Sequence, residues 1–507
     1  MRIAEILLLI SALYTSEAAN ECDLRAVENG TVCVCNSTYC DTVPEVLSLS
    51  SGEYQLYTTS KDKLGFYSSN GKFVEATAAS STVTISNLNT TYQKITGFGG
   101  AFTDAAGINV AMLPADAQDK LLESYFGKDG VQYSMGRVPI GGTDFSPRGY
   151  SYCDTKDETL ESFALPEEDT KYKIPYIKKA IELRGEDPFR LFATAWSSPT
   201  WMKTTDSFVG LGQLKDEYYG LWAEYYIKFF ESYKQENISF WGVTTQNEPA
   251  NGILGFPINN LGFLPDQMNK WISANLGPRI RNSSFSHLKI IAHDESRGSL
   301  LFFNEFTLSN DDVVNYLDGV GIHWYSDNAI PPSALELAST SKKDLFKLST
   351  EACTGFAHFL EMEPAVLLGS WERGVSYIED ILENLENDVV GWIDWNMVLD
   401  TEGGPTWVGN TVDAPVIANA TAGEFYKQPM FYGLGHFSKF VTPGSVRIDA
   451  TTNTDLKVLA FLRPDEKLAL ILWNRDDAAV SAEIQILGSA TSLEVPASSL
   501  NTLLYFP

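Results

Sequence analysis

The sequence predicts an α/β protein in which a (β/α)8 TIM barrel is combined with a β-sandwich. Two observations lead to this fold class. From about residue 95 to 397, eight apolar strand-like runs alternate with stretches of helical periodicity. After residue 445 this alternation stops, and short apolar runs separated by turn residues follow, as in β-sandwiches. The 507 residues, of which 44% are hydrophobic, suffice for several layers around a buried core.

Residues 1–19 are typical of a secretory signal peptide. Arg2 gives a positive start, residues 6–13 form a short apolar run, and Ser16 and Ala18 are small residues at suitable cleavage positions. The run is too short to span a bilayer, and a buried N-terminal helix is the alternative. We therefore expect a removable leader and an oxidising compartment for the mature chain.

Four of the six cysteines lie close together, at Cys22, Cys33, Cys35 and Cys40. In an oxidising compartment they are expected to form two disulfides, for which three connectivities exist. A zinc knuckle is the alternative, although the spacing matches no common zinc pattern. Six glycosylation sequons also favour the secretory pathway, and they begin at Asn29, Asn36, Asn89, Asn237, Asn282 and Asn419.

The expected barrel strands are short and rich in apolar residues. They cover residues 94–100, 133–140, 190–196, 240–246, 288–294, 319–325, 345–351 and 389–395. Between the third and fourth strands, apolar and aromatic residues recur at helical spacing over residues 217–234, which predicts an amphipathic helix. A doubly wound sheet is the alternative architecture, but the glycine-rich turn typical of many such folds is missing.

The sandwich is expected to use both ends of the chain. The C-terminal strand candidates cover residues 446–452, 456–464, 467–474, 481–487 and 501–506. Residues 53–92 contain similar alternating runs, such as residues 81–88. The barrel is therefore expected to be inserted between two parts of one sandwich.

Composition excludes several functional classes. The chain has 65 acidic and 37 basic residues, a formal net charge of −28, which disfavours nucleic acid as a partner. The five histidines are scattered and form no HExxH motif, so we expect no metal. Neither a glycine-rich phosphate loop nor a GxSxG elbow occurs, and we expect no organic cofactor.

Active sites of such barrels lie at the carboxyl ends of the strands. Polar and aromatic residues at these ends are Asp104, Trp196, Asn247, Glu248, Asp294, His323, Tyr325, Glu351 and Trp395. Glu248 follows one predicted strand and Glu351 ends another. Two carboxyl groups near tryptophans suit glycoside hydrolysis, in which one acid protonates the leaving oxygen and the other attacks the sugar. For either glutamate alone, a surface salt bridge is the alternative.

Several motifs in their observed order resemble glycoside hydrolase family 30. The likeness extends from Cys22 nearly to the C-terminus. It includes TTQNEP at 244–249, LSTEAC at 348–353, ITGFGGAFTDAAG at 95–107, WSSPTWMK at 196–203, GSWERG at 369–374 and FYKQPMFYGLGHFSKF at 425–440. The loops at 250–260 and 354–365 depart from the family pattern. The resemblance implies a retaining β-glucosidase that cleaves glucosylceramide.

The resemblance also implies a role for each site residue. Glu248 would be the general acid/base and Glu351 the nucleophile, while Asn247 would contact the sugar 2-hydroxyl. His323 and Tyr325 would lie beside the nucleophile. Cys353 would be a free thiol lining the site rather than a nucleophile, since no histidine is placed to activate it. The remaining hydroxyls of the glucose would be held by Asp104, Trp196, Trp395 and Asn410.

For the organisation of the chain, the resemblance implies the disulfides Cys22–Cys33 and Cys35–Cys40 in an N-terminal flap. This flap, residues 20–45, would pack with residues 397–428. The expected division is then a signal peptide at 1–19, a sandwich from 48–92 plus 445–507, and a barrel from 93–396 plus 429–444. The state of Cys153 stays open.

The partners implied by the resemblance are glucosylceramide in membranes, a saposin-type activator and a membrane sorting receptor. The compartment would be the lysosome, with full secretion as the alternative.

Two other functions are alternatives: another family 30 activity, such as a β-xylosidase or an endo-acting hydrolase, and a non-catalytic relative that binds sugar or lipid. The pair Glu248 and Glu351 argues against the second, because binding alone does not need both carboxyl groups.

Overall fold

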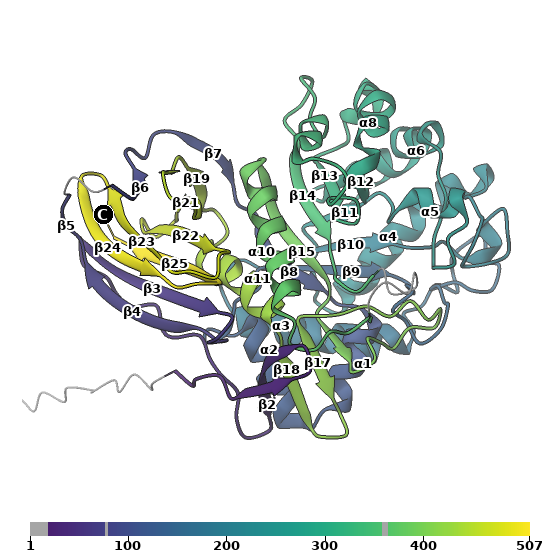
Figure 1. Cartoon of the computed structure of the whole chain (residues 1–507). Coiled ribbons are helices and arrows are strands. Elements are labelled where there is room, and N and C mark those ends of the chain that lie inside the picture. Colours follow the sequence, from purple (N-terminus) through teal and green to yellow (C-terminus); the bar gives the residue numbers. More distant parts are fainter. Residues whose placement is uncertain (1–18, 77–79, 357–363, 507) are drawn as a thin grey trace, which may run out of the picture.

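The computed structural model describes residues 19–76, 80–356 and 364–506. The predicted signal peptide therefore lies outside the described residues except for its last position. Within the described residues, no helix combines the length and the apolar character needed to cross a membrane. The strands of the described residues form three β-structures (Figure 1).

The first is a closed barrel of eight parallel strands, which confirms the predicted fold class. Each strand lies within or overlaps its predicted run, because buried parallel strands are continuous apolar segments that sequence pattern reveals. The strands are β8 (Gly97–Ala101), β9 (Met135–Ile140), β10 (Arg190–Ala195), β11 (Gly242–Thr244), β12 (Lys289–Ser296), β13 (Gly319–His323), β14 (Phe346–Glu351) and β15 (Val389–Asn396).

Helices cover the outside of the barrel. The predicted helix at 217–234 is α4, Tyr219–Gln235, and its aromatic stripe is buried. In α10, Trp371–Glu386, apolar residues three and four apart face the barrel and α11. The other α-helices are α1 (Asp104–Met112), α2 (Ala115–Phe126), α3 (Ile174–Arg184), α5 (Pro249–Leu254), α6 (Pro265–Trp271), α7 (Gly277–Arg281), α8 (Leu300–Phe303), α9 (Asp311–Val314) and α11 (Pro429–Phe440).

The second structure is a two-sheet sandwich formed by early and late parts of the chain, seen as purple and yellow strands in Figure 1. The first sheet has the order β4 (Tyr67–Lys72), β3 (Glu53–Ser60), β25 (Ser499–Tyr505), β22 (Leu468–Asn474), β21 (Lys457–Leu462), β19 (Val446–Ile448) and β7 (Thr91–Lys94). The second has the order β20 (Thr451–Thr452), β6 (Thr82–Ile85), β23 (Val480–Ile486), β24 (Ser489–Val495) and β5 (Val74–Glu75).

Two details of the sandwich differ from the prediction. The run at 446–452 is not one strand: β19 pairs with β21, whereas β20 pairs with β6 in the other sheet. The chain changes sheets at Asp449, whose N–H donates to the carbonyl of Thr90. Strand β24 was not predicted, because its sequence alternates small and polar residues and lacks a strong apolar run.

The third structure is a small sheet in the order β1 (Leu24–Val27), β2 (Gly30–Asn36), β18 (Glu424–Lys427), β17 (Val416–Asn419) and β16 (Val398–Asp400). It joins the N-terminus to the segment that follows β15. Disulfides Cys22–Cys33 and Cys35–Cys40 are present as the resemblance implied, so these sulfurs are not free to ligate zinc. Cys153 is unpaired and buried.

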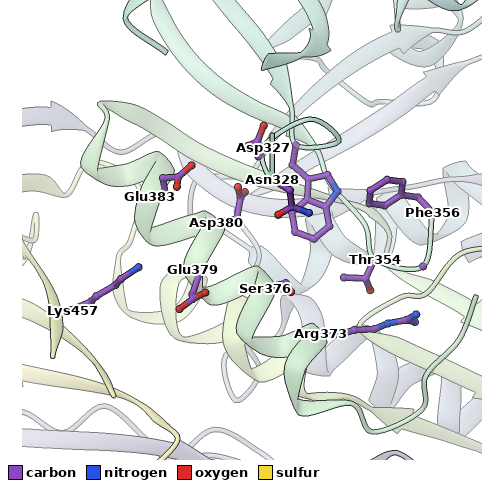
Figure 2. A pocket seen from close by; sticks show the side chains of 12 residues that line it. Asp327, Asn328, Thr354, Phe356, Arg373, Ser376, Glu379, Asp380, Glu383 and Lys457 are labelled. Carbon is purple, nitrogen blue, oxygen red and sulfur yellow. The ribbon is translucent and has the colours of Figure 1, made fainter. Parts of the chain in front are cut away.

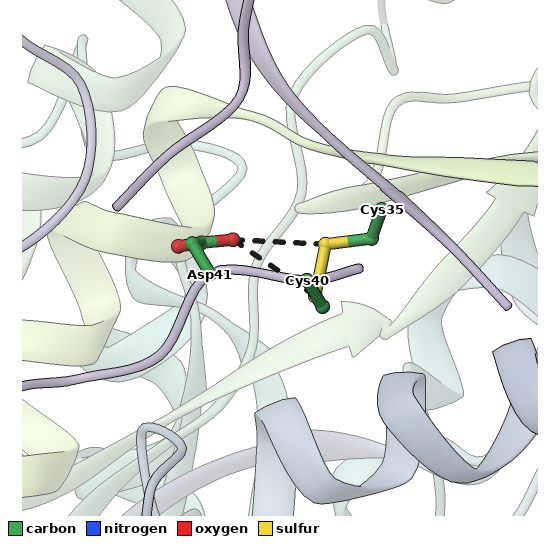
Figure 3. A group of neighbouring side chains, drawn as sticks. All are labelled: Cys35, Cys40 and Asp41. Atoms are coloured by element: carbon green, nitrogen blue, oxygen red, sulfur yellow. Dashed lines mark hydrogen bonds between the residues drawn. A yellow bond between two sulfur atoms is a disulfide. The ribbon is translucent and has the colours of Figure 1, made fainter. Parts of the chain in front are cut away.

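A buried acid anchors this sheet beside the second disulfide. Asp41 lies next to Cys35 and Cys40 (Figure 3). It accepts hydrogen bonds from the ammonium group of Lys427 at 2.9 Å and from the hydroxyl of Tyr432 at 2.7 Å. The N-terminal segment is thereby tied to both β18 and α11.

Candidate active site

Glu248 follows β11 and precedes helix α5. Its backbone is left-handed, with φ 39° and ψ 63°, a conformation that is uncommon outside glycine and is found at functional sites. Its N–H donates to the carbonyl of Asp294 at 3.0 Å. One carboxylate oxygen accepts from Nδ1 of His323 at 2.9 Å, and the other from the amide of Asn251 at 2.6 Å. These contacts fix both the backbone and the carboxyl group.

Glu351 is the last residue of β14 and is buried. One of its oxygens accepts from the hydroxyl of Tyr325 at 2.7 Å, and the other pairs with Arg137. A carboxylate oxygen of Glu248, a ring nitrogen of His323 and a carboxylate oxygen of Glu351 all lie within 4.8 Å of one another. The two glutamates therefore face the same small volume.

Arg137, in the middle of β9, contacts side chains from three other strands or strand ends of the site. Its guanidinium is fully buried and contacts Glu351, Oδ1 of Asn247 at 2.9 Å and Oδ2 of Asp294 at 3.0 Å. It also lies 4.6 Å from the ring centroid of Trp196. Burial alone would lower the pKa of Arg137, but the charges of Asp294 and Glu351 outweigh it and raise the pKa. Arg137 is thus a permanent cation beneath two carboxylates.

His323 lies between two carboxylates. Nδ1 faces Glu248, and Nε2 faces Oδ1 of Asp294 at 3.1 Å. Burial opposes its charge, but the negative charge of Glu351 and the hydrogen bonds to Asp294 and Glu248 raise the pKa of His323 to about 10. Because a carboxylate oxygen faces each ring nitrogen, this histidine is placed to donate from both of them.

The two glutamates have different surroundings. Glu351 is held in a buried position by the guanidinium of Arg137 and the hydroxyl of Tyr325. Glu248 is held by an imidazole and an amide at the edge of the site, with 13% of its side chain exposed. Two carboxyl groups at this separation and in distinct environments can divide nucleophilic and acid/base work.

Comparison with known proteins assigns the chain to a family. The glycosyl hydrolase family 30 TIM-barrel domain matches residues 95–441, and the family 30 beta sandwich domain matches residues 444–503. The chain belongs to glycoside hydrolase family 30.

Individual relatives and solved structures are also similar to this chain. Lysosomal acid glucosylceramidase of Mus musculus is 39% identical over 94% of this chain and 93% of its own length. The solved endo-beta1,6-glucanase BT3312 is 26% identical with a TM-score of 0.77, covering 90% of this chain and 100% of that one. SrfJ from Salmonella typhimurium, at 24% identity, TM-score 0.82 and the same coverage, shows the shared fold.

The structure brings most of the family 30 site candidates together. Asn247, His323 and Tyr325 contact the two glutamates directly or through Arg137. Cys353 is buried and unpaired, with its sulfur 3.4 Å from the Tyr325 hydroxyl. Burial raises the pKa of the Cys353 thiol well above its usual range, so it stays a thiol.

Three other candidates are engaged with protein partners. Trp196 and Trp395 stack on each other, with ring centroids 4.8 Å apart, and both are buried. Asp104 accepts from Ser146 at 2.5 Å and from Tyr150 at 2.9 Å. Their contacts with a sugar remain predictions.

Sequence reasoning missed two ionisable residues of this site. Arg137 lies inside a strand rather than at its end, so the strand-end pattern did not select it. Asp144 lies in the loop after β9, and its carboxylate accepts from the amide of Asn410 at 2.8 Å. Asp294 ends a predicted strand but received no role, although Arg137, His323 and Thr244 all donate to it.

Asp144 is expected to make the free energy of unfolding depend on pH. Burial raises its pKa to about 7; the hydrogen bond from Asn410 opposes this, and the charges of Glu351 and Glu248 add to it. In the unfolded chain the carboxyl titrates near its ordinary value of about 3.9. Between these values the folded state binds more protons, so the free energy of unfolding should fall as pH rises. The shift corresponds to up to about 4 kcal/mol.

The Asp144→Asn variant isolates this contribution. Urea unfolding of wild type and variant at pH 4.5 and pH 7.5 should show the wild type losing stability relative to the variant as pH rises. A stability difference that is the same at both pH values would contradict a buried, protonated Asp144.

Proposed function

We propose that this family 30 protein is a retaining β-glucosidase that hydrolyses glucosylceramide to glucose and ceramide in sphingolipid catabolism. The observation that carries the mechanism is the approach of Glu248 and Glu351 to within 4.8 Å. Retaining glycosidases hold their two carboxyl groups about 5–5.5 Å apart, whereas inverting enzymes need about 6.5–9.5 Å to admit a water. The observation that supports the substrate is the 39% identity to a lysosomal acid glucosylceramidase.

In the proposed reaction, Glu351 attacks the anomeric carbon and forms a glycosyl ester, while Glu248 gives its proton to the departing ceramide oxygen. Glu248 then takes a proton from water, whose oxygen displaces Glu351 and restores the starting enzyme. Arg137 and Tyr325 hold the nucleophile in place during both steps. Asn247 would contact the 2-hydroxyl, and Asp104, Trp196, Trp395 and Asn410 the other hydroxyls.

An endo-acting family 30 activity is the second candidate. It is favoured by the 26% identity to an endo-beta1,6-glucanase. A β-xylosidase would need a site that accepts a sugar without the 6-hydroxymethyl group.

One experiment separates these activities. We expect hydrolysis of glucosylceramide in detergent and of an aryl β-glucoside, with rates on an aryl β-xyloside and on β-1,6-glucan lower by at least tenfold. Early NMR spectra of the glucoside reaction should show β-glucose first. α-Glucose as first product would contradict retention, and a preference for the glucan would favour the second candidate.

We also propose peripheral membrane association, since the substrate is a membrane lipid. Leu254 and Phe256 are exposed large apolar residues in the segment that follows Glu248, and Leu211 is exposed beside Gly255. The other loop that departs from the family pattern, residues 354–365, lies outside the described residues at 357–363. Leu254→Ser should lower the rate on glucosylceramide in vesicles but leave the aryl glucoside rate unchanged. Equal effects on both substrates would contradict lipid contact.

For the compartment we propose the secretory pathway with lysosomal delivery. The support is the lysosomal relative and the position of the sequons: Asn29, Asn89, Asn237 and Asn282 are exposed, whereas Asn36 and Asn419 are half-buried.

The saposin-type activator and the sorting receptor are proposed by family analogy alone. An unchanged rate on glucosylceramide vesicles after addition of a saposin would contradict the activator.

A further inference from the structure

Helix α5 supplies a side chain that contacts the proposed acid/base. Glu248 is the residue before the helix, and Asn251 lies in its first turn. The side-chain amide of Asn251 donates to Oε2 of Glu248 at 2.6 Å, and its backbone N–H donates to the Glu248 carbonyl at 3.0 Å. Within the described part of the chain, the Asn251 side chain hydrogen-bonds only to Glu248. No other side chain there competes for this amide.

The contact between the two side chains does not cap the helix. In a capping box, the side chain before the helix accepts from the backbone N–H three residues on, and the side chain of that residue reaches back to the first N–H. Neither bond forms here, because the N–H of Asn251 goes to a backbone carbonyl and the N–H of Glu248 goes to the carbonyl of Asp294. Asn251 therefore acts on the carboxyl group of Glu248 rather than on the helix end.

The two oxygens of Glu248 are held from two different segments. Oε1 accepts from His323 on β13 at 2.9 Å, and Oε2 accepts from Asn251 on α5. One contact alone would let the carboxyl group rotate about its last bond, whereas contacts on both oxygens fix its plane. A general acid must lie about 2.6–3.2 Å from the oxygen that it protonates, so a fixed plane favours proton transfer.

Asn251 is itself anchored. Its carbonyl accepts from the N–H groups of Gly255 and Phe256 at 2.9 and 3.0 Å, which closes the last turn of α5. Beside it, Gly252 packs closely against Gly262, since a Cβ atom on Gly252 would come within 2.2 Å of the Gly262 nitrogen. A donor fixed in this way needs little reorganisation when the carboxyl group loses or regains its proton.

A cavity of about 460 Å³ lies beside α10, and its wall includes Trp324, Phe356 and Asp380 (Figure 2). Neither Glu248 nor Asn251 lines this cavity. Water in the cavity therefore does not compete for the hydrogen bond between these two side chains.

We propose that Asn251 is a positioning residue, which holds the carboxyl group of Glu248 in the orientation for proton transfer to the leaving group. The inference deepens the proposed function, since it rests on Glu248 being the general acid/base. Its consequence is selective: leaving groups that need a proton depend on the orientation of Glu248, whereas activated leaving groups depart without one. The expected defect lies in protonation and not in the attack by Glu351.

Asn251→Ala and Asn251→Asp both remove the donor. Alanine is a better helix former than asparagine, so α5 should persist, and aspartate keeps the shape of the side chain. On a methyl β-glucoside, kcat/KM should fall about 10–100-fold, less than when a general acid is removed outright. On dinitrophenyl β-glucoside, kcat/KM should stay within about twofold of wild type, since kcat/KM reports the first step and that leaving group needs no proton.

Two controls separate positioning from a general loosening of the segment. The amide of Asn260 holds the carbonyls of Phe256 and Ile258, so Asn260→Ala should lower the melting temperature and affect both glucosides equally. The double variant of Glu248→Gln with Asn251→Ala should be no slower on the methyl glucoside than Glu248→Gln alone, because no acid is left to position.

The single variant Glu248→Gln, measured on the same two glucosides, separates this inference from the proposed function. If it shows the leaving-group dependence and the Asn251 variants do not, the positioning role is overturned while the proposed function stands. If Glu248→Gln shows no such dependence, Glu248 is not the acid and both are overturned. Equal losses on both glucosides in the Asn251 variants, or additive losses in the double variant, would show a structural role alone and also overturn the inference.

Discussion

Replacing Glu351 with glutamine is expected to abolish turnover of every β-glucoside, whatever its leaving group. An amide cannot attack the anomeric carbon, so no glycosyl ester forms. The side chain keeps its size, and Tyr325 still has an oxygen to donate to, so the fold should persist. We expect kcat on an aryl glucoside to fall on the order of 10⁴-fold or more, as for other lost nucleophiles. Steady-state rates and circular dichroism on the same preparation measure both effects.

The matched variant is Glu248→Gln, because it alters the other carboxyl of the same site. Glucosides with activated leaving groups need little protonation, so their first step should survive, while alkyl glucosides should lose on the order of 10²–10⁴ in rate. Azide needs no base and should rescue the second step, giving β-glucosyl azide. Equal losses in both variants, without an azide product, would mean that the two roles are wrongly assigned.

The barrel could be predicted because its strands are encoded locally. Segments such as Gly319–His323 and Val389–Asn396 are buried throughout, so they stand out as apolar runs wherever they pair. That Glu248 and Glu351 lie close together could be predicted for a related reason: Glu248 follows such a run, Glu351 ends one, and the strand ends of a barrel converge. At these two positions the apolar strand pattern therefore also indicates where the candidate site lies.

What could not be predicted depends on contacts between distant segments. Arg137 reads as one polar residue inside an apolar strand, and its role appears only when the closed barrel brings β12 and β14 to it. The pairing of β2 with β18 and the crossing from β19 to β20 are likewise decided by tertiary packing. Periodicity carries no information on such partners.

Arg137→Met should be the most damaging single change outside the two glutamates. It leaves Glu351 buried without its guanidinium partner and leaves Asp294 with His323 as its remaining cation, and breaking a buried ion pair in this way costs about 3–5 kcal/mol. It also removes the donor that holds Asn247, so activity should fall on the order of 10²–10³ in kcat, as when one preorganised donor is lost. Thermal unfolding and steady-state kinetics measure the two losses separately.

Two further variants distinguish charge from geometry at this position. Arg137→Lys keeps the cation but not the planar fork that reaches three partners, so it should recover more of the stability than of the activity. Arg184→Met removes another buried arginine, one whose partners are Asp187 and the carbonyl of Gln132, and should leave kcat within twofold of wild type. If Arg137→Met instead melts within two degrees of wild type and keeps most of its kcat, Glu351 does not need this cation, and Tyr325 and the strand end must position it alone.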